Sequence, residues 1–140
     1  MVPNSPQEKQ NPAPPAGLSD ASYTLEAPKT PYQSIEDYAE KVALENDISP
    51  ARFKHLIACE SRWKEDAAGD SGTSLGILQF KAPTFTQFSK KYNLESYDYD
   101  LQDPYQQMDL AARMIRDGYL SHWKNCARKT GWMYDQITRQ

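Results

Sequence analysis

The sequence predicts a mainly α-helical domain with a glycine-rich loop or small hairpin after its second helix. Apolar residues recur at intervals of three and four, which is the spacing of a helix face. Ser49-Pro50 and Asp103-Pro104 are pairs typical of helix starts. Three of the six glycines interrupt the pattern after the second expected helix: Gly69, Gly72 and Gly76. The 140 residues have the length of a single domain.

Composition excludes several function classes. The formal net charge of −3 argues against a dedicated nucleic-acid-binding protein, which usually carries a basic excess. No apolar run approaches the roughly 18 residues that a membrane span needs. Two cysteines and two histidines are too few for a zinc site with four protein ligands, so we expect no metal and no cofactor. A monomer is the default expectation.

The first 33 residues differ in composition from the rest of the chain. They hold seven of the ten prolines and almost no large aliphatic side chain. Such a segment buries too little apolar surface to offset its ordering entropy, so we expect a flexible tether. The alternative is that Tyr23, Leu25 and Tyr32 pack onto the domain. No export signal is visible in this chain, yet a proline-rich tether fits a protein that works outside the cytoplasm.

The folded domain is expected over residues 34–126, followed by a tail over 127–140. Ser34 and Asp37 resemble a capping box and predict a helix to about Asn46. Ser49 is the expected N-cap of the second helix.

Two further helices are expected after the glycine-rich segment. Pro83 predicts the start of a short helix that ends near Tyr92. Asp103-Pro104 predicts the longest helix. Its apolar stripe is Met108, Ala111, Ala112, Ile115 and Tyr119.

The second helix carries a carboxylate where its apolar face should continue. Phe53, Leu56 and Ile57 form the buried stripe, and Glu60 occupies the next position on it. Burial raises the pKa of a carboxyl group toward the range of a general acid, and Trp63 is expected to supply an apolar wall. The alternative is that the helix frays here and Glu60 is solvated at its rim.

The residues around Glu60 resemble a known family. Glu60-Ser61 ends a helix, and Gly76-Ile77-Leu78-Gln79 follows as a Gly-x-x-Gln segment. Over about residues 48–126 the chain is similar to the lysozyme-like lytic transglycosylases of the soluble type. The segment 69–72 also resembles the corresponding loop of goose-type lysozymes. The resemblance implies a lysozyme-like fold.

The resemblance also implies an activity on peptidoglycan. Glu60 would protonate the oxygen of the β-1,4 bond between N-acetylmuramic acid and N-acetylglucosamine, and then act as a base. With one carboxylate, the 6-hydroxyl of the sugar attacks and leaves a 1,6-anhydro end. A second carboxylate that activates water would give hydrolysis, and Asp70 is the candidate. The alternative for Asp70 is an ordinary turn residue that bonds its own backbone.

Four more residues receive supporting roles. Ser74 is expected to hydrogen-bond Glu60, and Gln79 to line the sugar groove. Gly76 would let the backbone approach the sugar closely. The family's Ala-Tyr-Asn-like motif has no clean match here, and Tyr119 is the nearest candidate for a residue that binds substrate or positions Glu60. Core packing is an equal alternative for Tyr119.

The two cysteines allow two interpretations. Cys59 precedes Glu60, and Trp123-x-x-Cys126 is similar to a motif of exported transglycosylase-like domains. A bridge would close a loop of roughly 66 residues, worth about 3 to 4 kcal/mol in the chain-entropy model, and clamp the helix of Glu60. The alternative is two separate buried thiols.

Two other classes of function remain as alternatives. A glycan-binding module would use the same groove without turnover, but a retained Glu at position 60 argues for chemistry. A helical interaction domain would have no affinity for saccharides, and its Glu60 would have an ordinary low pKa.

Overall fold

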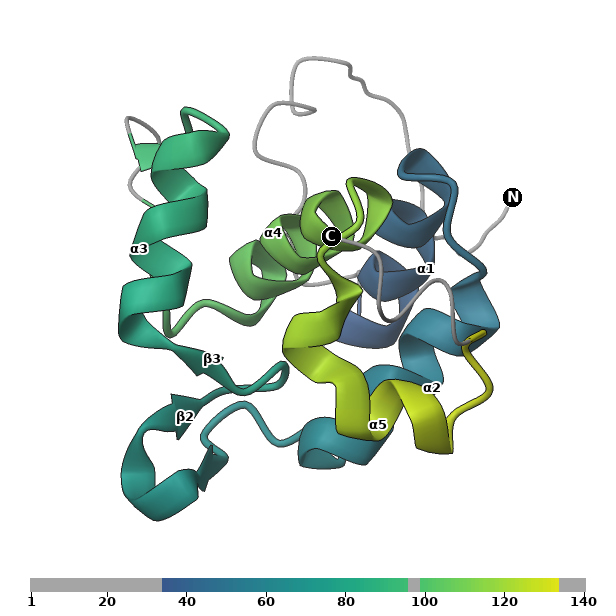
Figure 1. The fold of residues 1–140 in the computed structure, drawn as a ribbon, viewed down its shortest axis with the longest axis horizontal. Coiled ribbons are helices and arrows are strands. Elements are labelled where there is room, and N and C mark those ends of the chain that lie inside the picture. The colour runs from purple at the N-terminus through teal and green to yellow at the C-terminus, as the bar shows by residue number, and fades with distance from the viewer. Residues whose placement is uncertain (1–33, 96–98, 134–140) are drawn as a thin grey trace, which may run out of the picture. The chain divides into compact units, whose positions relative to one another are not determined.

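The computed structural model describes residues 34–95 and 99–133. The tether predicted over residues 1–33 lies outside the described residues, as does the end of the predicted tail, from residue 134. The described part is mainly helical, as predicted, with one small antiparallel sheet (Figure 1). Within the two described ranges no helix is long and apolar enough to cross a membrane.

Helix α1 (Ile35–Glu45) begins where the sequence predicts it. Ser34 is the N-cap, and its Oγ accepts a hydrogen bond of 3.0 Å from the backbone N–H of Asp37. This bond satisfies one of the N–H groups that have no partner inside the helix, which is why the chain turns helical at this point.

Helix α2 (Pro50–Ser61) also begins at its predicted cap. The Oγ of Ser49 accepts a hydrogen bond of 3.3 Å from the backbone N–H of Arg52. The helix ends because Arg62 adopts a left-handed conformation with φ of 56°. Glu60 therefore lies in the last turn of α2, near the edge of the core.

The apolar stripe of α2 forms the centre of the core, as predicted. Phe53, Leu56 and Ile57 are each 0% exposed. They belong to one cluster with buried side chains of α1, α4 and the segment between Leu75 and Phe80, including Val42, Ile77, Leu78, Met108, Leu110 and Met114. Burial on this scale anchors α2 rigidly, so the side chain at its end has a defined direction.

Helices α3 (Ala82–Lys91) and α4 (Pro104–Arg116) follow the predicted starts within one residue. The carboxylate of Asp103 caps α4 by accepting hydrogen bonds from the backbone N–H groups of Tyr105 and Gln106. Four of the five residues predicted for its apolar stripe lie within α4 and are buried: Met108, Ala111, Ala112 and Ile115. The fifth, Tyr119, lies beyond the end of α4, so its assignment to this stripe was wrong.

The glycine-rich segment forms the predicted small hairpin, extended to three strands. Strands β1 (Ala68–Gly69), β2 (Ser74–Leu75) and β3 (Phe80–Lys81) pair antiparallel in that order. A short 3-10 helix, η3 (Asp70–Gly72), connects β1 to β2. This sheet follows α2 in the chain and leads directly into α3 (Figure 1).

The chain continues as a 3-10 helix, η5 (Leu120–Trp123), and then α5 (Lys124–Lys129). Figure 1 shows α5 beside α2. Ala127 is 0% exposed and Trp132 is 8% exposed. Packing therefore continues past residue 126, where the sequence predicts that the domain ends, because α5 and Trp132 complete the core.

Candidate active site

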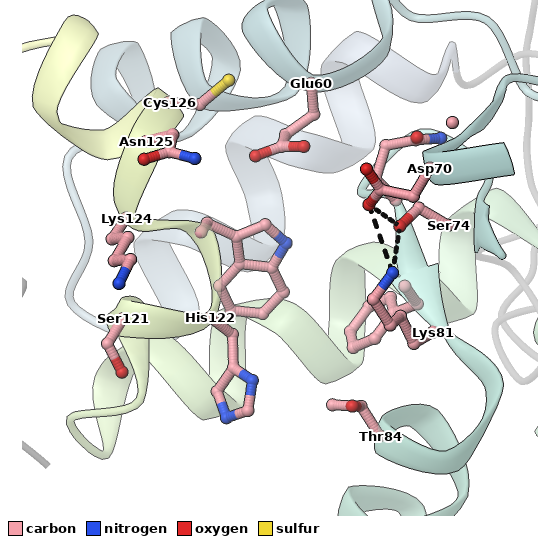
Figure 2. Close-up of a pocket in the computed structure, with 14 residues that line it drawn as sticks. Glu60, Asp70, Ser74, Lys81, Thr84, Ser121, His122, Lys124, Asn125 and Cys126 are labelled. Atoms are coloured by element: carbon pink, nitrogen blue, oxygen red, sulfur yellow. Dashed lines mark hydrogen bonds and ion pairs between the residues drawn. The ribbon is translucent and has the colours of Figure 1, made fainter.

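An open cleft of about 390 Å³ lies at the end of α2. Glu60 projects into it from α2, and Asp70, Ser74 and Lys81 lie together on the side of the small sheet (Figure 2). The remaining wall comes from the segment 121–126, which spans η5 and α5. Clefts of this volume are within the range of ligand-binding sites.

Glu60 has the electrostatic environment of a general acid. Burial of the carboxyl group, with a smaller effect from the negative charge of Asp70, raises its pKa from 4.5 to about 7. Among the described residues none forms a hydrogen bond or an ion pair with this carboxyl group. No hydrogen-bond donor or cation in the described ranges therefore stabilises its ionised form, and below about pH 7 most of it holds a proton that it can donate.

Trp123, rather than Trp63, supplies the aromatic wall of the cleft. Trp63 packs against the core and does not line the cleft, so this prediction was wrong. The indole N–H of Trp123 donates a hydrogen bond of 2.8 Å to the carbonyl oxygen of Leu78, and its ring meets Phe80 edge-on. The signal for Trp123 was its place in Trp-x-x-Cys, three residues before the partner of Cys59.

Asp70, Ser74 and Lys81 form a hydrogen-bonded cluster. The Oγ of Ser74 donates to Oδ2 of Asp70 at 2.6 Å, and Nζ of Lys81 lies 3.2 Å from the same oxygen (Figure 2). Both interactions hold the pKa of Asp70 below its usual range. Ser74 was predicted to hydrogen-bond Glu60, and this prediction was wrong, because its hydroxyl bonds Asp70. The sequence reasoning missed Lys81, and no motif marks it.

The cleft therefore contains two carboxyl groups with opposite environments. Glu60 is half-buried and without a described partner, so its pKa is raised. Asp70 is exposed and paired, so its pKa is lowered. Near neutral pH Asp70 is ionised while much of Glu60 is protonated. Such a separation of pKa values makes Glu60 the candidate for a general acid.

Gln79 lines the cleft, at the position that the sequence predicts. Its backbone adopts a left-handed φ of 50°. Its amide nitrogen donates to the carbonyl oxygens of Gly76 at 2.9 Å and Ala67 at 3.3 Å. A Cβ on Gly69 would lie 2.5 Å from the amide oxygen of Gln79, so the glycine makes room for this side chain.

Gly76 has a different role from the one predicted. It does not line the cleft; its backbone has φ of +82°, and a Cβ there would lie 2.2 Å from Nε2 of Gln107. Gln107 is 1% exposed and donates to the carbonyl oxygens of Leu75 and Leu101, while its Oε1 accepts from the N–H of Leu78. The absence of a side chain at Gly76 therefore leaves room for the Gln107 amide, whose hydrogen bonds to Leu75 and Leu78 connect the β2–β3 segment to α4.

We expect Gly76→Ala to destabilise the domain by about 3 kcal/mol, because a positive φ adds strain and the methyl group displaces the Gln107 amide. Thermal unfolding at pH 5 measures this. The matched control is Gly72→Ala, at φ of +88° but with no atom within 4 Å of the new Cβ. This control should cost only about 1 kcal/mol. Equal losses for the two variants would contradict the role assigned to Gln107.

Tyr119 does not reach the cleft. It precedes η5, and its ring meets the ring of Phe88 edge-on with centroids 4.9 Å apart. The ammonium group of Lys91 lies over the Tyr119 ring, 5.8 Å from its centroid. The structure therefore places Tyr119 in core packing, the alternative to a role at Glu60.

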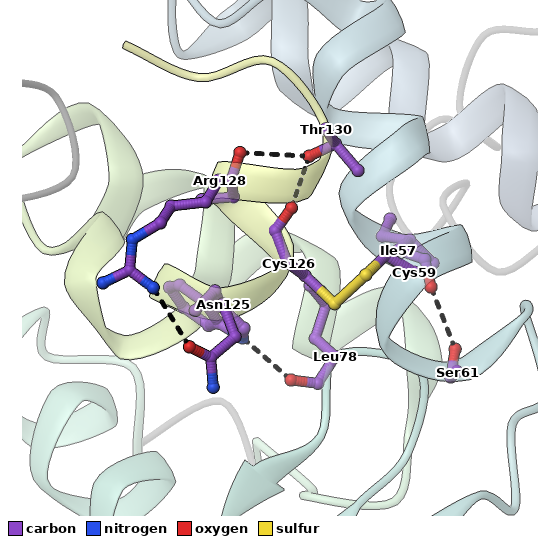
Figure 3. The surroundings of a disulfide bond; sticks show 10 residues. Ile57, Cys59, Ser61, Leu78, Asn125, Cys126, Arg128 and Thr130 are labelled. Carbon is purple, nitrogen blue, oxygen red and sulfur yellow. Dashed lines mark hydrogen bonds between the residues drawn. A yellow bond between two sulfur atoms is a disulfide. The ribbon is translucent and has the colours of Figure 1, made fainter. Parts of the chain in front are cut away.

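Cys59 and Cys126 form a disulfide that joins α2 to α5, with Cα atoms 5.7 Å apart (Figure 3). Cys59 precedes Glu60, and Cys126 lines the cleft together with Asn125. The bond therefore holds two walls of the cleft together. In the described ranges no three His, Cys, Asp or Glu side chains lie close enough to bind a metal ion.

A family model described as the transglycosylase SLT domain matches residues 37–129. The chain belongs to this family. The SLT domain is a lysozyme-like helical domain that acts on peptidoglycan by cleaving glycosidic bonds, and the matched region includes every cleft-lining residue. No curated protein and no solved structure matches the chain.

Proposed function

We propose that this SLT domain cleaves the β-1,4 bond between N-acetylmuramic acid and N-acetylglucosamine by lytic transglycosylation, with Glu60 as its only general acid and base. The observation that carries this proposal is the raised pKa of Glu60, about 7, in a cleft whose other carboxylate is paired with a lysine. The mostly buried Trp123 contributes a small apolar surface to the cleft, and Ser121, Thr84 and Asn125 offer polar groups at its wall.

In the proposed reaction, protonated Glu60 donates its proton to the glycosidic oxygen, and the bond from that oxygen to C1 of the muramic acid breaks. The acetamido group of the same sugar stabilises the positive charge that develops at C1. The Glu60 carboxylate then removes the proton of the 6-hydroxyl of the same sugar, whose oxygen attacks C1. Glu60 regains its proton, no water is consumed, and the product has a 1,6-anhydro end.

Three alternatives make different demands on the cleft. A lysozyme would use Asp70 to activate water, and the pairing of Asp70 with Ser74 and Lys81 weakens it as a base. A helical interaction domain or a binding module has no use for a carboxyl group whose charged form is destabilised, and the interaction domain predicts an ordinary pKa for Glu60. The raised pKa therefore favours catalysis.

The test is mass spectrometry of the fragments that the protein releases from purified peptidoglycan. We expect products that are lighter than hydrolysis products by one water and that carry anhydro ends. Asp70→Asn is expected to retain most activity and to give the same products. Fragments with reducing ends would indicate a lysozyme, and the absence of any fragments together with saccharide binding would indicate a binding module.

We further propose that the protein acts as a monomer outside the cytoplasm, with glycan strands and not nucleic acid as its partner. The substrate lies there, and disulfides such as Cys59–Cys126 persist in oxidising compartments.

A further inference from the structure

We infer that Lys81 is a positioning residue that determines the product of the reaction: by holding Asp70, it prevents this carboxylate from activating water and leaves the 6-hydroxyl of the sugar as the acceptor. This inference rests on the proposed function, because it concerns the choice between two acceptors at the same site.

The sheet builds the contact between the two side chains. Ser74 on β2 pairs directly with Lys81 on β3, and on its other side with Gly69, the residue before Asp70. The side chains of directly paired residues lie on the same face of a sheet. Ser74 is 4% exposed, so its hydroxyl is a rigid bridge between the lysine and the aspartate.

The ammonium group of Lys81 is fully engaged by this cluster. Its three N–H donors have three acceptors within hydrogen-bond distance: Oδ2 of Asp70 at 3.2 Å, Oγ1 of Thr73 at 3.2 Å and Oγ of Ser74 at 2.9 Å. No donor remains for a substrate group. Lys81 therefore acts through Asp70 and not on the sugar.

The same contacts reduce the ability of Asp70 to accept a proton. Oδ2 receives the hydrogen bond of Ser74 and the ion pair of Lys81, and both stabilise the ionised carboxylate. The strength of a general base falls with its pKa, so a stabilised carboxylate is a weaker base for water. It still carries a negative charge that faces Glu60 across the cleft (Figure 2).

The two outcomes at C1 of the muramic acid differ by one water. In transglycosylation the 6-oxygen bonds to C1, its proton returns to Glu60, and the end is anhydro. In hydrolysis a water oxygen bonds to C1, a carboxylate takes the water proton, and the end is reducing. Weakening Asp70 as a base slows only the second route, since the first uses Glu60.

The experiment measures the ratio of reducing to anhydro ends by mass spectrometry of digests. We expect Lys81→Met to raise this ratio by about threefold or more, a modest effect because the ion pair is partly exposed. Lys81→Arg keeps the charge and is the matched control, with a ratio close to that of the wild type. Adding Asp70→Asn to Lys81→Met should return the ratio to the wild-type value.

The ratio is a property of each cleavage event, so partial unfolding of a variant does not change it. Ser74→Ala removes the other contact to Asp70 and should shift the ratio in the same direction. An unchanged ratio in both Lys81→Met and Ser74→Ala would overturn the inference, and so would a raised ratio that Asp70→Asn fails to reverse. Reducing ends as the main product of the wild type would instead overturn the proposed function.

Discussion

Glu60→Gln is expected to abolish cleavage of peptidoglycan while leaving the fold intact. Glutamine fills the same volume but cannot donate a proton to the glycosidic oxygen, and a positioned general acid contributes about 100-fold to 10,000-fold in rate. The assay is release of soluble fragments at pH 6, with far-ultraviolet circular dichroism as the control for folding. Residual activity above about 1% of wild type would place the acid at another residue.

The same substitution should stabilise the domain at higher pH. The folded-state pKa of Glu60, about 7, lies above its ordinary value of 4.5. Between these values the unfolded chain is ionised while the folded protein holds the proton, so wild-type stability falls as pH rises from 4.5 to 7. The full shift corresponds to at most ~3 kcal/mol, and solvent screening at the half-buried carboxyl leaves about 1 to 2 kcal/mol.

Urea unfolding of wild type and Glu60→Gln at several pH values measures this effect. The difference in unfolding free energy should be smallest near pH 4, grow through pH 6 and level off above pH 7, in favour of the variant. In parallel, wild-type kcat/KM should decline as pH rises through about 7, because the free enzyme loses the acid. A stability difference independent of pH would show that the Glu60 carboxyl is fully solvated.

Removing the disulfide is expected to cause the largest loss of stability. Cys59→Ser combined with Cys126→Ser should cost about 4 kcal/mol, because the cross-link shortens a long loop of the unfolded chain. For a domain of this size that corresponds to a fall in Tm of about 20 °C. Activity should be lower even at temperatures well below the new Tm, since Cys126 and Asn125 form one wall of the cleft. Differential scanning calorimetry and the fragment-release assay measure the two effects.

Reduction of the wild type offers the matched control for this variant. A thiol reductant should lower the Tm of the wild type to that of the double serine variant and leave the variant unchanged. Full activity of the double variant well below its Tm would contradict the role of the bond in holding the cleft, even if the loss of stability were observed.

Local signals in the sequence predicted much of the fold. The starts of α1, α2 and α4 depend on a capping side chain, followed at once by a proline in α2 and α4, and the buried stripe of α2 depends on spacings of three and four. These features act between neighbours in the chain, so the starts of α1, α2 and α4 agree with the structure. The position of Glu60 at the edge of the core follows from the same periodicity, because α2 runs without a break from Pro50 to Ser61.

The composition of the cleft wall was decided by tertiary structure. Trp123 bonds the carbonyl of a residue 45 positions away, and Gln107 bonds the N–H of a residue 29 positions away. No periodicity links such distant residues. The roles predicted for Ser74 and Gly76 differ from their observed contacts with Asp70 and Gln107, because these contacts depend on strand register and on the approach of α4, which local sequence does not specify. The sequence by itself therefore determined which residue is the candidate acid, whereas only the packing of the sheet and α5 decided which groups surround it.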